Sequence, residues 1–517
     1  MANTITTFQP DFDVQFITPN SGQRSYKNDV VRIEVHQTVD EMVNQWKVIM
    51  KPRDYDSQTA YEFIDVMTYC EISFKKHNTT MTPVIRGFVT KITKNSDISQ
   101  GKAERNIIIE GENYGKIIRM SQIHYLYGYD KQSIVSAQGT SSPIFQAYHI
   151  DTFTGNQNIS EIIGSIFTNL VLPNFENVKA FLADRTGSGT GSGDPSKLNW
   201  GQTDALNIKN FDYVPDTDGV TGLRNVIGKA LTFVSRMAGA NEGSVYDFIK
   251  TYCNFPWNEI FVEDLPTSTR LNFRPTPFRD IGGNFIGATN FTNETVNPNI
   301  ATIDSTELIS YNLSRSDEDV INYFFTDCVF QPRDGTPFET FARATIGSSS
   351  NLNLNPTFIA GEIDYKIQDG TETTTKLGTG DYGAFKLAFS RIELFGLRKK
   401  TFSCQFISVT SAVDAKGEPQ VTETSNPVEN SKLLNQVLVQ AYDHNSALEN
   451  GSFMISGRED IRAGMYVEVQ TNRTEADTHM YYVSSLVHIF IPFANFTTQL
   501  NVTRGEGYLD HKVSGQY

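Results

Sequence analysis

The stretch from Gly451 to Arg504 constrains the fold more than any other part of this chain. Short β-prone runs alternate there with glycines, and two longer β-prone runs follow, Tyr481–Phe490 and Phe496–Arg504. The segment between these runs contains Pro492, which has no N–H to donate to a sheet ladder. The pattern predicts short strands joined by tight turns and a final hairpin, in a small antiparallel barrel or sandwich.

A second set of β-prone runs lies near the N-terminus and predicts a first barrel. The first of them, Val30–His36, alternates apolar and polar residues with the period of a half-buried strand. The runs are Val30–His36, Gln45–Met50, Cys70–Phe74, Pro83–Ile92 and Arg105–Glu110.

Between these two β regions the period changes to that of an amphipathic helix. Asn158–Leu170, with Ser160 as a candidate N-cap, and Gly222–Met237 each place apolar residues on one helical face. Ser244-Val-Tyr-Asp247 is a capping-box variant that predicts a short helix. Another helix is expected over Asn430–Asn445, whereas residues 335–420 show no clear pattern and are interpreted as an insertion.

Composition limits the classes of function. The chain has 517 residues, 12% aromatic content and a formal net charge of −15, so several packed domains are expected and a surface built to grip phosphate backbones is not. No basic region followed by an apolar run occurs at the start, and no apolar run is long enough for a membrane-spanning helix. The four cysteines are widely spaced without a CxxC pair, which favours free thiols and assembly in a cytoplasm.

Several short motifs, in a particular order along the chain, resemble those of one protein family. They are Arg86-Gly87-Phe-Val, Trp257-Asn258-Glu259 with the following Arg274-Pro275-Thr-Pro277-Phe278, the Arg-Ser-Asp element that ends at Asn322, and the final barrel with Gly457, Gly464 and Arg504. Together they are similar to the baseplate or tail hub proteins of tailed bacteriophages. That family includes the hub part of spike proteins in contractile injection machines.

The resemblance implies a mainly β fold with two tube-like antiparallel β-barrels and an inserted α+β domain, assembling as a trimeric ring. The implied domains are a first barrel over residues 1–120, the insertion over 121–320, a second barrel over 321–508 interrupted around 335–420, and a tail over 509–517. In this family the Trp257–Phe278 segment forms a hairpin that Trp257 and Phe261 would anchor, with Pro275 and Pro277 ending its second strand.

The implied function is structural: a hub in the virion that adapts a sixfold tail tube to a threefold central spike and lets DNA pass without specific binding. The implied partners are two further copies of the chain, the tail tube protein, the central spike, the tape-measure protein and other baseplate proteins. The expected location is the tail tip, after assembly in the host cytoplasm. The net charge of −15 permits an acidic channel.

The sequence does not favour catalysis. The eight histidines show no HExxH or HxH spacing, no Gly-x-Ser-x-Gly elbow occurs, and Cys404 lies in an alternating strand pattern, so we expect no enzyme, no metal and no cofactor. His488 is interpreted as a structural histidine in a strand. Two alternatives remain open at this point: a tail-associated peptidoglycan hydrolase, and a β-rich tail protein that binds host glycans.

Overall fold

The computed structural model describes residues 10–18, 22–55, 58–78, 80–99, 102–123, 163–164, 166–185, 208–215, 243–253, 258–277, 299–318, 320–321, 323–328, 385–387, 395–396, 398–404, 412–413, 419–420, 448–470 and 478–505. The fold over these residues is mainly β, as predicted. The helices predicted over Gly222–Met237 and Asn430–Asn445, and most of the insertion at 335–420, lie outside the described residues.

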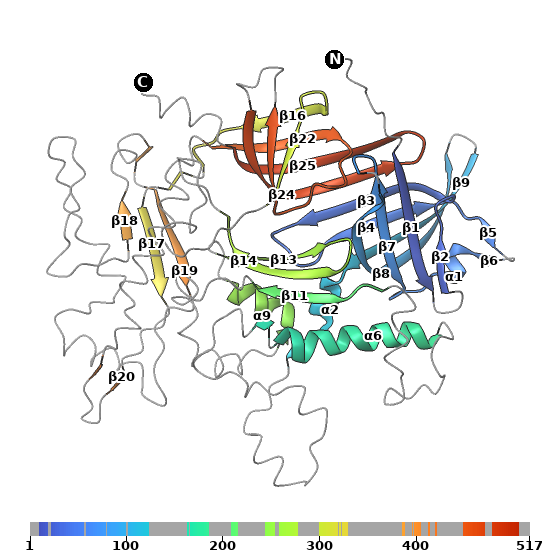
Figure 1. Cartoon of the computed structure of the whole chain (residues 1–517), viewed down its shortest axis with the longest axis horizontal. Helices are drawn as coiled ribbons and strands as arrows, with labels where there is room; N and C mark the ends of the chain where they lie inside the picture. The colour runs from blue at the N-terminus through green and yellow to red at the C-terminus, as the bar shows by residue number, and fades with distance from the viewer. Residues whose placement is uncertain are drawn as a thin grey trace, which may run out of the picture.

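Most described strands belong to one 13-stranded sheet with the order β16-β22-β25-β24-β3-β4-β9-β8-β7-β1-β2, in which β23 also pairs with β24 and β15 pairs with β23 (Figure 1). We call its N-terminal strands the N-terminal module: β1 (Asp11–Thr18), β2 (Gly22–Ser25), β3 (Val30–Thr38), β4 (Gln45–Met50), β7 (Tyr69–Lys75), β8 (Thr82–Ser99) and β9 (Lys102–Asn113). The C-terminal module consists of β15 (Ile300–Ile303), β16 (Leu308–Ser314), β22 (Glu449–Ser456), β23 (Tyr466–Gln470), β24 (Thr478–Ile491) and β25 (Asn495–Gly505).

The strands expected from the alternating patterns are present in both modules. β4 coincides with the predicted run, and β24 and β25 form the predicted hairpin on either side of a turn at residues 492–494. β15 and β16 pair with β23 and β22, so these residues lie in the C-terminal module although the expected domain boundary is at residue 320. β24 also pairs with β3, so the two β regions are joined into one sheet.

The two modules repeat one another in strand order and in register. Neighbouring strands follow the order β3-β4-β9-β8-β7 in the N-terminal module and β16-β22-β25-β24-β23 in the C-terminal module. In both modules the first two strands in space are also the first two along the chain, and the other three follow in reverse, so β3, β4, β7, β8 and β9 correspond to β16, β22, β23, β24 and β25. The first strand pair of each module has a bulge at an equivalent position. It lies between Val30 and Arg32 in the β3–β4 pair and between Leu308 and Ser310 in the β16–β22 pair. The strands that flank β7 and β23 on the outer side differ between the modules, since β1 is antiparallel to β7 whereas β15 is parallel to β23.

A second bulge matches more closely still. β8 is irregular between Val89 and Lys91, and β24 between Val483 and Ser485. The carbonyl before each bulge accepts a hydrogen bond from a residue with positive φ: Met67 at 2.8 Å, with φ 64°, and Gly464 at 2.9 Å, with φ 85°. Such agreement in local detail identifies two copies of one structural module.

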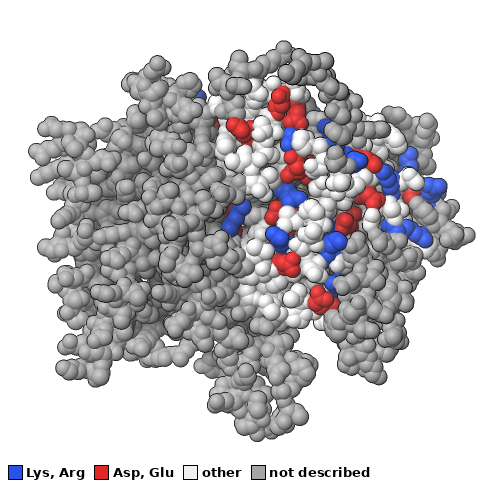
Figure 2. Space-filling view, in the orientation of Figure 1, with Lys and Arg blue, Asp and Glu red and all other residues white. Residues whose placement is uncertain are grey.

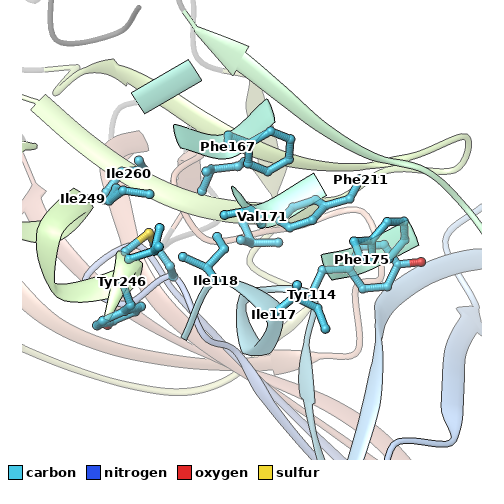
Figure 3. Packing of buried hydrophobic residues seen from close by; sticks show 14 of the residues in the cluster. Tyr114, Ile117, Ile118, Phe167, Val171, Phe175, Phe211, Tyr246, Ile249 and Ile260 are labelled. Atoms are coloured by element: carbon cyan, nitrogen blue, oxygen red, sulfur yellow. The ribbon is translucent and has the colours of Figure 1, made fainter. Parts of the chain in front are cut away.

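A layer of helices and a small sheet lies beneath the large sheet (Figure 1). The helices are α2 (Gly115–Met120), the π-helical turn η2 (Phe167–Val171), α6 (Leu172–Arg185) and α9 (Val245–Tyr252), and the small sheet has the order β11 (Phe211–Pro215), β14 (Thr269–Pro275), β13 (Asn258–Asp264). Their apolar side chains form one core in which Tyr114, Phe167, Phe175 and Phe211 pack together (Figure 3).

The helix predictions are partly confirmed. Ser244 caps α9, its Oγ accepting from the N–H of Asp247 at 3.1 Å. Ile163, Ile166 and Phe167 are buried as predicted, but the helical segment does not end at Leu170: it continues through η2 into α6. Pro173, which has no N–H to donate, follows directly after the π-helical turn η2, in which the N–H of Leu172 donates to the carbonyl of Phe167. Ser160 lies outside the described residues.

The remaining described elements are short. They are α1 (Ala60–Phe63), the pairs β5 (Asp54–Tyr55) with β6 (Gln58–Thr59), β10 (Gln122–Ile123) with β12 (Gly243–Ser244) and β20 (Ala412–Val413) with β21 (Pro419–Gln420), and a sheet of β17 (Tyr323–Cys328), β18 (Phe385–Leu387) and β19 (Lys399–Cys404). Cys404 therefore ends a strand, as its alternating context predicts. Within the described part of the chain, every helix is too short or too polar to cross a membrane.

Candidate assembly interface

The hairpin β13–β14 lies where the two modules meet, and it is the segment predicted between Trp257 and Phe278 (Figure 1). Phe261 is buried in a small apolar cluster with Val39 of the N-terminal module and Tyr466 and Tyr482 of the C-terminal module. The hairpin thus contacts both modules through one anchor. Trp257 and Phe278 lie outside the described residues, so the anchoring role of Trp257 stays a prediction.

Arg86 holds the turn of this hairpin. It is 1% exposed, and its guanidinium donates to the carboxylate of Glu71 at 2.7 Å and to the backbone carbonyls of Leu265, Pro266 and Ser268 in the β13–β14 turn. A planar guanidinium is suited to several acceptors at once. The N-terminal module therefore binds the hairpin turn by a buried cation.

Asp264, at the end of β13, lies near this cation. Burial raises the pKa of its carboxyl to about 6, although Arg86 and a 2.6 Å hydrogen bond from the hydroxyl of Thr269 act in the opposite direction. Arg86 therefore interacts electrostatically with two carboxyl groups, those of Glu71 and Asp264.

Arg274 makes the corresponding contact with the C-terminal module. Its Nε donates to Glu259 at 2.6 Å, and its Nη2 donates to the carbonyl of Gly464. Glu259 also accepts from the hydroxyl of Tyr482 on β24. Burial would lower the pKa of Arg274, but the charges and hydrogen bonds of Glu259 and Tyr482 together outweigh it, so the pKa is raised and the guanidinium stays charged.

Residues 457–464 form a charged loop that touches three parts of the molecule. Arg458 is 5% exposed at its side chain and pairs with Glu307 at 2.9 Å and Asp460 at 2.8 Å. The buried carboxylate of Glu459 accepts backbone N–H groups of Lys76 and Asn78 in the N-terminal module. Arg462 reaches Glu263 on the hairpin at 3.3 Å. This loop joins the two modules and the hairpin by charge as well as by packing.

Three predicted motif glycines occupy places where a larger residue would collide. A Cβ at Gly87 would lie 1.8 Å from the carbonyl oxygen of Glu112, a close backbone approach of the kind a glycine in a strand indicates. At Gly457 it would enter the ring of Phe496. Gly464 has φ 85°, and a Cβ there would lie 2.9 Å from Arg274.

The other predicted motif residues are distributed around the same junction. Asn258 pairs with Pro275 at the end of the hairpin, where β14 stops, and the buried Pro277 accepts a hydrogen bond from the hydroxyl of Tyr466. Arg504 lies over the ring of Tyr482 at 5.1 Å. Asn322 lies outside the described residues.

The seam between the modules is the pairing of β24 with β3, from Ser485 opposite Thr38 to Phe490 opposite Ile33. At the end of the seam, β24 and β25 supply Phe490 and Phe496 to the core of the N-terminal module, where the ring centroids of Phe490 and Phe12 lie 4.8 Å apart. One hairpin therefore belongs to both cores.

His488 lies within this seam and is fully buried. Burial lowers the pKa of its imidazole to about 3, so the ring is neutral at ordinary pH. Its Nδ1 lies 2.9 Å from the hydroxyl oxygen of Thr498, which also accepts from the backbone N–H of Arg458. The hydroxyl proton is thus available to Nδ1. These contacts fit the structural role predicted for His488.

The exposed face of the large sheet carries both signs of charge. Glu34, Lys47, Glu110 and Lys91 lie opposite one another on four consecutive strands, and Lys91 is 3.8 Å from Glu110. Figure 2 shows acidic and basic side chains interspersed on the described face, with Lys and Arg gathered toward the end where β9, β5 and β6 lie. Charge of both signs is therefore exposed on this part of the described surface.

Sequence reasoning missed most partners of the motif residues. Glu71, Glu459 and Tyr482 complete the junction, yet each lies in an ordinary strand or turn pattern. The signal that was available is the cluster of charges next to glycines in Gly457-Arg-Glu-Asp-Ile-Arg-Ala-Gly464, an unusual density for a segment inside a barrel.

No family model matches the sequence, and no curated protein matches it. Solved structures with a similar course of the chain do exist, at low identity. They include the 43 kDa tail protein of prophage MuSo2 from Shewanella oneidensis (9% identity, TM-score 0.43, 96% of this chain and 98% of that one) and the prophage tail protein gp18 from Listeria monocytogenes (8%, 0.40, 95% and 94%).

A third is the E. coli c3393 protein, described as a component of the type VI secretion system with structural similarity to the T4 bacteriophage tail proteins gp27 and gp5 (8% identity, TM-score 0.36, 92% of this chain and 73% of that one).

Proposed function

We propose that this chain is a structural protein of a phage-type tail, and that it forms the hub between the tail tube and the central spike. The observation that carries the proposal is the presence of two copies of one β module in a single chain, with the same strand order and the same bulges. Three such chains in a ring present six similar modules to a sixfold tube. The same ring keeps threefold symmetry for a spike.

The junction supports a rigid adaptor. Arg86, Arg274 and the loop at residues 457–464 fasten the hairpin and both modules to one another, and the β24–β25 hairpin belongs to two cores. A protein that connects a spike to a tube needs a fixed angle between its two modules. Buried charge pairs favour one such angle, because any movement that separates a pair leaves an uncompensated buried charge.

The experiment is the mass of the purified chain by light scattering, together with negative-stain micrographs of the same sample. The expected result is three times the chain mass and a ring with a central hole. The partners to add next are a tail tube protein and a spike, which should bind opposite faces of the ring. A monomer at every concentration that also binds neither partner would refute the proposal. Clearing of cell walls in a zymogram would instead favour the hydrolase alternative.

A further inference from the structure

The strands β8 and β24 occupy equivalent places in the two modules, and both change partner at their bulge. Before the bulge, β8 pairs with β7 through Phe88 and β24 pairs with β23 through Tyr482. After it, β24 pairs with β3 of the other module. The corresponding part of β8, from Lys91 onward, pairs with β9 on one side only among the described strands.

The strand equivalent to β3 is β16, and it ends the sheet. Its inner side pairs with β22, and no described strand pairs with its outer edge. The exposure of its side chains agrees with an interrupted core: Tyr311 is 53% exposed, whereas the equivalent Ile33 of β3 is 0% exposed. Ile309, at the bulge, is 55% exposed. An unpaired strand edge of this length is a template for pairing with another chain.

The turn that follows each of these strands is also repeated. After β3 the N–H of Asp40 donates to the hydroxyl of Thr38 at 3.2 Å, and after β16 the N–H of Glu318 donates to the hydroxyl of Ser316 at 3.0 Å. The end of β16 therefore has the local shape that β3 presents to β24 in the seam.

We propose that the seam inside the chain is repeated between chains: β16 of a second copy pairs antiparallel with β8 of the first. Transferring the register of the β24–β3 seam places Lys91 opposite Ser316 of the second copy and Ser96 opposite its Tyr311. The contact is head to tail, so each copy uses one β8 edge and one β16 edge, and a ring forms if the rotation closes. That the ring closes at three copies rests on the proposed function.

The edges of β8 and β16 carry more charged side chains than the equivalent positions of the β24–β3 seam, which suits assembly between chains. Lys94 stands at the position of His488, and Lys91 would lie beside Glu318 of the second copy. Lysines on an edge oppose indiscriminate pairing, and an acidic partner next to them favours the intended one. The seam between chains is thus more polar than the seam within the chain, which a subunit that must first exist alone requires.

The test is disulfide trapping in the full chain. The transferred register pairs Thr93 with Ser314, equivalents of Val487 and His36, so Thr93→Cys with Ser314→Cys brings two thiols within bridging distance. The matched control is Ser96→Cys with Ser314→Cys, displaced by three residues or roughly 10 Å. The single variants measure any linkage through the native cysteines.

The expected result is covalent closed oligomers for the in-register pair, formed at least about tenfold faster than for the displaced pair. Rings and trimers in solution without this preference would overturn the edge pairing and leave the hub proposal standing. In-register linkage into open chains or into a ring of another size would support the edge pairing and refute the hub. A monomer that forms no linked product overturns the edge pairing.

Discussion

Replacing Phe490 by alanine tests whether the β24–β25 hairpin holds the two modules together. Phe490 is 3% exposed and lies in the core of the N-terminal module, although its strand also forms part of the C-terminal core. Its ring centroid lies 4.8 Å from that of Phe12, 5.4 Å from Phe74 and 5.3 Å from Phe496. Removing it leaves a cavity among aromatic rings.

The expected loss in the free energy of unfolding follows from this burial. Truncation of a buried phenylalanine to alanine destabilises a core by roughly 3–5 kcal/mol. Since the phenylalanine enters the N-terminal core from the other module, we expect the loss of about 4 kcal/mol to fall on the N-terminal module and on its coupling to the C-terminal one. The C-terminal core, with Leu486 and Leu500, should keep its own packing.

The assay is unfolding in urea, monitored by hydrogen exchange of the backbone amides in each module. The variant should open its N-terminal strands at lower urea than its C-terminal strands, whereas the parent chain opens them closer together. Met454→Ala is the matched control, because Met454 is 37% exposed on the same sheet and should cost within about 1 kcal/mol. A loss for Phe490→Ala no larger than that of the control, or an equal loss in both modules, would refute the reasoning.

Three further predictions concern the junction and the seam. Arg86→Gln should lower stability by roughly 3–5 kcal/mol, since it leaves buried acceptors without a cation, and limited proteolysis should then cut first in the β13–β14 turn; an uncut turn would contradict the clamp. Gly464→Ala should cost roughly 1–3 kcal/mol more than Gly396→Ala in thermal unfolding, because the strain of a positive φ is common to both and only at Gly464 does a new Cβ meet packed side chains. His488→Gln should flatten the pH dependence of stability: the folded pKa of His488 is lowered to about 3, so the unfolded state binds the proton more tightly and the parent chain loses about 2 kcal/mol between pH 6.5 and pH 5. Equal urea midpoint shifts in parent and variant over that range would show that His488 does not titrate as described.

The sequence alone predicted the local structure of this chain where the local signals are strong. A period of two predicts a strand because successive side chains alternate between faces, and it located β3, while β-prone runs bounded by turn residues located β4, β24 and β25. A serine followed three residues later by an acid located the start of α9. The hairpin between β13 and β14 was implied by the family resemblance, and Pro275 and Pro277 indicated where its second strand ends.

The tertiary structure decided which of these elements meet. Arg86 contacts carbonyls about 180 residues further along the chain, and β3 pairs with β24 across most of its length. Neither contact has a local signal, because any edge strand presents the same N–H and C=O groups to any other. The resemblance implied two tube-like barrels, but the strand-by-strand correspondence of the two modules became visible only in their strand order and in the register of their bulges. Burial requires apolar side chains at equivalent positions but does not require the same residues there. For that reason the sequence determined the strands and turns, and only the packed structure determined the seam, the junction and the edges left for a partner.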